Sequence, residues 1–210
     1  MIPSMSLESA GQQSGQRWRA LDDPVAIRAL AHPLRLDLLS VISRLGTATT
    51  ADAARELGIS HGLASHHLHQ LAKYGFVEQV AGKDNRERPW RLTATSYRYP
   101  RDQRTPSATA ATDVLEQVTA ERALAAFLDW QRRRTAWPEE WLSAAGMGTA
   151  TVYLTLPELT ALTEAIDGLI RPYIEERVID DVTARPPGSV PVDLTLFAVP
   201  DAEQPPTPEE

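Results

Sequence analysis

Two short helical segments that meet at Gly58 constrain the fold of this chain more than any other part of the sequence. The first begins at Thr49, whose spacing to Asp52 resembles a capping box. The second follows Ser60, a favoured N-cap residue, and covers residues 61–74. Two short helices joined by a tight turn that contains glycine are typical of a helix-turn-helix. The sequence therefore predicts this motif here.

The second helix has a narrow apolar face and a polar face. With about 100° between successive residues, the apolar stripe consists of Ala64, Leu68 and Leu71. Ser65, His66 and His69 point the opposite way, and His67 borders the stripe. Short polar side chains can reach the edges of base pairs in the major groove of DNA. The pattern therefore favours a helix that reads DNA.

The segments around this motif predict a larger unit. Prolines after Asp23 and His32 are expected to begin two helices, over residues 24–31 and from residue 33 until Gly46 ends the second. Residues 76–80 and 89–92 are expected to form a hairpin, with the charged loop 82–88 at its tip. Helices, a helix-turn-helix and a hairpin with a basic tip follow one another in a winged helix.

The net charge of −7 argues against DNA binding if it is taken for the whole chain. The charge is divided, however. Residues 1–104 hold 14 Lys+Arg and 10 Asp+Glu, a net charge of +4, whereas residues 105–210 carry −11. We expect the basic half to approach the duplex and the acidic half to be repelled by it.

Three stretches resemble the ArsR-type winged-helix transcription regulators: residues 28–42, residues 49–80 with the S-x-x-L pattern of Ser65 and Leu68, and residues 82–95. The last of these is similar to the wing of an actinobacterial-looking subgroup with an added C-terminal domain. The resemblance implies a dimeric repressor on a palindromic operator. It also implies that Ser65 and His66 lie in the base-reading zone and that the wing crosses the DNA backbone.

The candidate DNA-binding residues are polar or basic and lie on the helix-turn-helix and the wing. They are Thr49, Ser60, His61, Gly62, Ser65, His66, His69, Lys73, Lys83, Arg86, Arg88 and Arg91. The cations among them are expected near phosphates, although those of the loop could form only a solvated turn. Trp90, between these cations, is expected to pack the wing against the core.

The absence of cysteine excludes a disulfide scaffold, a thiolate zinc site and an iron–sulfur cluster. Metal-sensing members of the ArsR type use ligand sets that contain cysteine, so no metal and no cofactor are expected. A metal-responsive regulator using His66 and His69 is an alternative, but a metal there would block the DNA-reading surface. The chain also lacks the common nucleophile, phosphate-loop and zinc-protease motifs, so we do not expect an enzyme.

The second half of the chain predicts a long helix over residues 112–136, either a dimerisation helix or a core helix. A small strand-helix-strand unit should follow, with strands at 151–154 and 190–198 and a helix in which Pro172 makes a kink or an end. This unit could bind a small-molecule effector or a second subunit.

Two groups of side chains near the end of the long helix have two interpretations each. Arg132, Arg133 and Arg134 could touch DNA or simply complement the helix dipole. Trp130, Trp137 and Trp141 could line an apolar ligand pocket, although a core role is more common for such aromatics.

The predicted class is α+β, an N-terminal winged helix-turn-helix domain followed by a long helix and the small strand-helix-strand unit. The expected organisation is a disordered N-terminus (1–16), the DNA-binding domain (17–99), a linker (100–111), a dimerisation or effector domain (112–199) and a disordered acidic tail (200–210). The expected function is sequence-specific regulation of transcription on double-stranded DNA by a homodimer. A winged helix that binds a protein partner is the alternative.

Two further expectations concern the location of the protein. No apolar run approaches the roughly 20 residues of a membrane-spanning helix, and the polar first residues do not form a secretory signal. We therefore expect a cytoplasmic, nucleoid-associated protein without a membrane partner.

Overall fold

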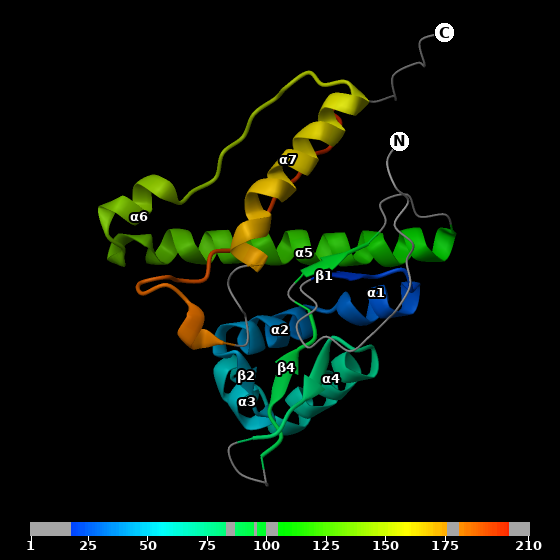
Figure 1. Ribbon diagram of the computed structural model, residues 1–210, viewed down its shortest axis with the longest axis vertical. Helices are drawn as coiled ribbons and strands as arrows, with labels where there is room; N and C mark the ends of the chain where they lie inside the picture. The colour runs from blue at the N-terminus through cyan, green and yellow to red at the C-terminus, as the bar shows by residue number, and fades with distance from the viewer. Residues whose placement is uncertain (1–17, 83–86, 95, 100–104, 176–180, 202–210) are drawn as a thin grey trace, which may run out of the picture.

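A computed structural model describes residues 18–82, 87–94, 96–99, 105–175 and 181–201 (Figure 1). The chain builds a compact helical unit with two small sheets, crossed by one long helix, and a further helix lies on the far side of it. The predicted α+β class, with an N-terminal winged helix-turn-helix and a long helix after it, is confirmed.

The first two helices begin as the proline positions predict. The helix α1 (Pro24–Leu30) is capped by Asp23, whose side chain accepts a hydrogen bond from Val25 N. The helix α2 (Pro33–Leu45) is capped by the imidazole of His32, which accepts from Leu34 N at 3.2 Å. Both caps satisfy a backbone donor that the first turn of a helix leaves free.

The helix-turn-helix consists of α3 (Thr50–Leu57) and α4 (His61–Lys73). The capping box of Thr49 and Asp52 is present, with hydrogen bonds in both directions. Gly58 ends α3 with a φ of 63°, a left-handed conformation that favours glycine. Ser60 caps α4 through a hydrogen bond that its hydroxyl accepts from Leu63 N.

The wing belongs to a three-stranded antiparallel sheet in the order β2-β4-β3. The strands β3 (Val77–Gln79) and β4 (Trp90–Leu92) form the predicted hairpin, and β2 (Thr47–Ala48) pairs with the outer edge of β4. A second sheet, not predicted, pairs β1 (Trp18–Ala20) in parallel with β5 (Ser96–Arg98). The predicted wing is therefore part of a larger strand arrangement.

One hydrophobic core joins the helix-turn-helix to the long helix α5 (Pro106–Arg133). The predicted stripe of α4 is fully buried in the protein interior. The first turns of α5 pack against α1, and Ala111 and Leu115 belong to the same core. Because α5 begins at Pro106, part of the segment predicted as a linker is helical, and the first turns of this helix complete the N-terminal unit.

Beyond α5 the chain forms η1 (Arg134–Ala136), α6 (Glu139–Ala144), α7 (Leu156–Glu175) and η2 (Val182–Ala184). The predicted helix is found in α7, and Pro172 lies inside it without ending it. Figure 1 shows α7 on the side of α5 that faces away from α3 and α4. No helix among the described residues is long and apolar enough to cross a membrane.

The two strands predicted at residues 151–154 and 190–198 do not form, although both segments lie within the described part of the chain. The alternating side chains of the second segment are instead exposed, as for Leu194 at 71%. Alternation produces a strand only where another strand supplies backbone partners. The described chain brings no such strand to either segment.

Candidate nucleic-acid interface

The outer face of α4 is polar and small near its beginning. His61, Gly62 and His66 are exposed, and Ser65 is half-buried. Figure 1 shows α4 and the strands of the wing at the end of the molecule opposite α7. A convex helix that carries short donors and acceptors suits the width of the major groove.

His69, also predicted to face DNA, is held by its neighbours. Its Nδ1 lies 2.8 Å from the carbonyl oxygen of Ser65, one turn earlier in α4. Its ring meets that of Trp90 edge to face, with the centroids 5.3 Å apart. These contacts orient the imidazole between α4 and the wing while its side chain stays exposed.

The hydroxyls of Thr49 and Ser60 are engaged in the protein itself. Thr49 Oγ1 accepts from Asp52 N at 3.1 Å and donates to Asp52 Oδ2 at 2.7 Å, and Ser60 Oγ caps α4. The hydrogen bonds from Thr49, followed by those from Arg55, hold the pKa of the Asp52 carboxyl below its ordinary value. Both residues therefore position the two helices of the motif.

The wing presents fewer free cations than the sequence suggests. Arg91 forms an ion pair with Glu78 on the neighbouring strand, with Nη2 2.7 Å from Oε1. Arg88 is exposed, whereas Lys83 and Arg86 lie outside the described residues. Lys73, in the last turn of α4, is exposed and lies over the ring of Tyr74. Trp90 is buried, and its Nε1 donates to Thr50 Oγ1 at 3.0 Å, which attaches the wing to the start of α3.

His67 occupies a different position from the other histidines of α4. Its ring lies 4.6 Å from that of His32 and 5.2 Å from that of His66, and its Nδ1 is buried without a hydrogen-bond partner. Burial lowers the pKa of both His67 and His32, and nearby Arg35 adds to this effect. Within the described ranges, no three His, Asp or Glu side chains are grouped closely enough to hold a metal ion.

Arg19 is an important residue that the sequence does not reveal. Its guanidinium donates to the carbonyl oxygens of Gly75 at 2.6 Å and Tyr74 at 2.7 Å, and lies 4.9 Å from the centre of the Phe76 ring. These contacts fix the end of α4 and the entry to the wing. No local sequence pattern predicts these contacts, because Arg19 and its partners are more than 50 residues apart in the chain.

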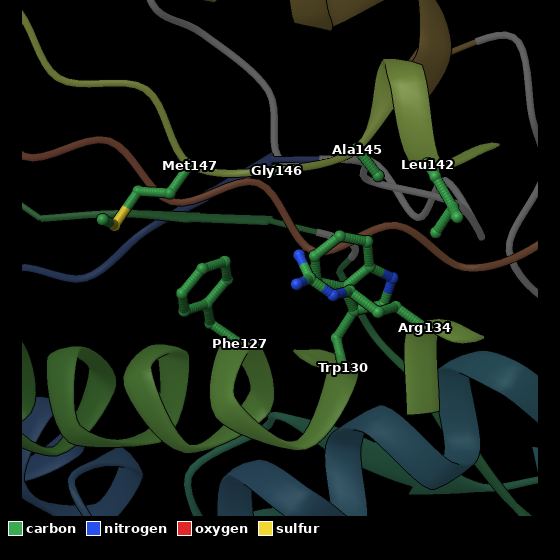
Figure 2. Close-up of a pocket in the computed structure, with 7 residues that line it drawn as sticks. All are labelled: Phe127, Trp130, Arg134, Leu142, Ala145, Gly146 and Met147. Carbon is green, nitrogen blue, oxygen red and sulfur yellow. The ribbon is translucent and has the colours of Figure 1, made fainter. Parts of the chain in front are cut away.

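The two ambiguous groups at the end of α5 adopt distinct arrangements. Arg132 and Arg133 both pair with Asp129, so these two cations are partly compensated on the helix itself. Trp137 and Trp141 pack against each other, with ring centroids 5.5 Å apart. Trp130 instead lines a cavity with residues of α6 and the segment after it (Figure 2).

Comparison with known proteins agrees with the N-terminal architecture. A family model described as a helix-turn-helix domain matches residues 30–80, from the end of α1 to the first strand of the wing hairpin. No curated protein sequence shows significant similarity to the chain. The family match supports a helix-turn-helix over these residues.

Several solved structures are similar to this chain at low sequence identity. The transcriptional regulator Tm0710 from Thermotoga maritima is 12% identical, with a TM-score of 0.30, over 71% of this chain and 87% of that one. An apo mutant of ZitR from Lactococcus lactis is 16% identical, with a TM-score of 0.28, over 71% and 90%. The heme sensor protein PefR from Streptococcus agalactiae, in complex with heme, is 18% identical, with a TM-score of 0.29, over 69% and 76%.

Proposed function

We propose that the protein is a sequence-specific regulator of transcription of the ArsR type, which binds its operator as a homodimer and acts as a repressor. The observation that carries this proposal is the division of α4 into a fully buried apolar stripe and an outer face with exposed His61 and His66. Because the apolar stripe is packed in the core, α4 can place its polar outer face into the major groove as a rigid helix.

The contacts divide into two classes in this proposal. Bases are read by the first two turns of α4, through His61, Ser65 and His66, with Gly62 allowing close approach. Phosphates are contacted by Lys73 and Arg88, together with the loop cations Lys83 and Arg86. Arg91 contributes less than the sequence suggests, because Glu78 already compensates its charge.

The dimer is supported by apolar side chains that the single chain leaves uncovered. On α5 they include Leu124, which is 58% exposed, and Leu128. On α7 they include Leu169, which is 72% exposed. Contiguous exposed apolar surface on a folded chain marks an interaction site. A second copy would cover these faces and present two recognition helices to a palindromic site.

The experiment is a titration of fluorescent fragments from the upstream region of the protein's own gene, over a series of salt concentrations. Affinity should fall steeply with salt, and Arg88→Ala should reduce the slope of log affinity against log salt by about 1. Arg28→Ala, an exposed arginine on α1, is the matched control and should leave the slope unchanged.

A second arm of the experiment tests base reading. Ser65→Ala with His66→Ala should reduce discrimination between the bound fragment and random DNA, and leave the salt slope unchanged. Retention of full discrimination by this variant would point to the protein-interaction alternative. Absence of binding to every upstream fragment at low salt would refute the proposal.

A further inference from the structure

A cavity that is open to solvent, with a volume of about 400 Å³, lies between the end of α5, η1, α6 and the segment that follows α6 (Figure 2). Phe127 and Trp130 rise into it from α5, and Leu142 and Met147 enter from the opposite side. Its volume falls within the range of about 300 to 1,000 Å³ that is common for small-molecule sites.

The wall formed by α5 is aromatic. The rings of Phe127 and Trp130 are stacked at an interplanar angle of 26°, with their centroids 6.2 Å apart. Two roughly parallel aromatic faces on one wall offer a planar apolar molecule the offset packing that aromatic rings prefer.

Among the described residues that line the cavity, Arg134 is the cation. The guanidinium of Arg134 lies 6.0 Å from the centre of the Trp130 ring and projects over it in Figure 2. Its two neighbours, Arg132 and Arg133, are paired with Asp129, but Arg134 has no ion pair with any described carboxylate. A guanidinium beside apolar walls is suited to a bidentate contact with a carboxylate.

We propose that this cavity binds a small aromatic carboxylate, with its ring against Phe127 and Trp130 and its carboxylate on Arg134.

The cavity lies on the same helix that completes the core of the DNA-binding unit. Nearer the start of α5, Arg122 donates hydrogen bonds to Asp37 and Ser40 of α2 at 2.9 and 2.8 Å. Through this contact, a shift of α5 on ligand binding would reach α2. If the ligand controls DNA binding in this way, that control rests on the proposed function.

Calorimetric titration of the full-length protein with 1-naphthoate tests the site. Arg134→Gln should weaken binding by about tenfold or more, because the variant loses the charge-assisted contact with the carboxylate. Arg133→Gln is the matched control, since its guanidinium is bound to Asp129 outside the cavity, and it should retain the affinity of the unmodified protein. The neutral 1-naphthalenemethanol should bind more weakly than 1-naphthoate.

Three results would overturn the proposal: no binding of 1-naphthoate at millimolar concentration, equal binding by the Arg134→Gln variant, or equal affinity for the neutral alcohol.

The two proposals fail in different ways. Fragment binding is titrated with and without 1-naphthoate, and a change in affinity supports the control of DNA binding from this cavity. Absence of DNA binding by the protein alone contradicts the proposed function, while the calorimetric comparison of the arginine variants still decides the site.

Discussion

The imidazole of His67 on α4 lies 4.6 Å from the imidazole of His32, which caps α2. The charged and titratable groups that act on this pair, Arg35 and His66, are also basic. The Nε of Arg35 and the Nδ1 of His67 are both buried without hydrogen-bond partners. The contact between the helix-turn-helix and α2 therefore favours neutral histidines.

A pH dependence of stability follows from this pair. Burial lowers the pKa of both histidines below 6.5, so the unfolded chain takes up protons first as the pH falls. The contribution of these histidines to the free energy of unfolding should be constant above pH 6.5. It should decrease as the pH falls below 6.5, until the pH reaches the folded-state pKa values. Urea unfolding between about pH 8 and pH 5 measures this decrease.

Replacement of one histidine tests the origin of this dependence. His67→Leu should flatten the fall in unfolding free energy, because it removes one of the two buried groups and the repulsion on the other. His61→Leu, at the exposed start of α4, should retain it. An unchanged slope in His67→Leu would refute this explanation.

The capping box of α3 should make a measurable contribution to stability. Thr49→Ala removes the acceptor of Asp52 N and the donor to its carboxylate. We expect the free energy of unfolding to fall by about 0.5 to 2 kcal/mol, measured by urea denaturation. Ser107→Ala, at an exposed position in the first turn of α5, should have little effect. Equal effects of the two substitutions would contradict the role of the cap.

The contacts of Arg19 with the end of α4 should contribute more to the free energy of unfolding than a surface ion pair does. Arg19→Ala leaves two carbonyl oxygens without their charged donor, so unfolding free energy should fall by about 1 to 3 kcal/mol. Asp167→Ala is the comparison, because its ion pair with Arg98 is about half exposed on both sides. That change should cost about 1 kcal/mol or less. The reverse order would show that Arg19 is not an anchor.

Self-association should depend on the uncovered face of α5. Leu124→Asp places a charge where we propose that the second copy packs, so it should raise the dimer dissociation constant by about tenfold or more. Sedimentation velocity over a range of protein concentrations measures the change. Gln131→Asp, an exposed position on the same helix, is the control. Dimers of undiminished affinity in Leu124→Asp would exclude this face.

Local sequence patterns predicted the helices of the N-terminal unit well. Each cap lies within three residues of its partner, as in the pairs Asp23–Val25, Thr49–Asp52 and Ser60–Leu63. The buried stripe of α4 followed from helical periodicity alone. The predicted outward positions of His61 and His66 are also found, and their contact with DNA stays a prediction.

Interactions between distant residues account for what the sequence left undetermined. The pairing of β1 with β5, the role of Arg19 and the compensation of Arg91 by Glu78 each join separate parts of the chain. The alternating segment 190–198 shows the converse, because its pattern has no strand partner in the described chain and it does not form a strand.

The sequence by itself therefore determined where the helices of the winged unit begin and end, and which face of α4 is buried. Caps and periodicity act over one helical turn, so a few neighbouring residues are sufficient to encode them. Only the tertiary structure decided which polar side chains of α4 and the wing remain available. Trp90 lies against His69 and Glu78 pairs with Arg91, and both contacts depend on what the fold brings to within a few ångströms.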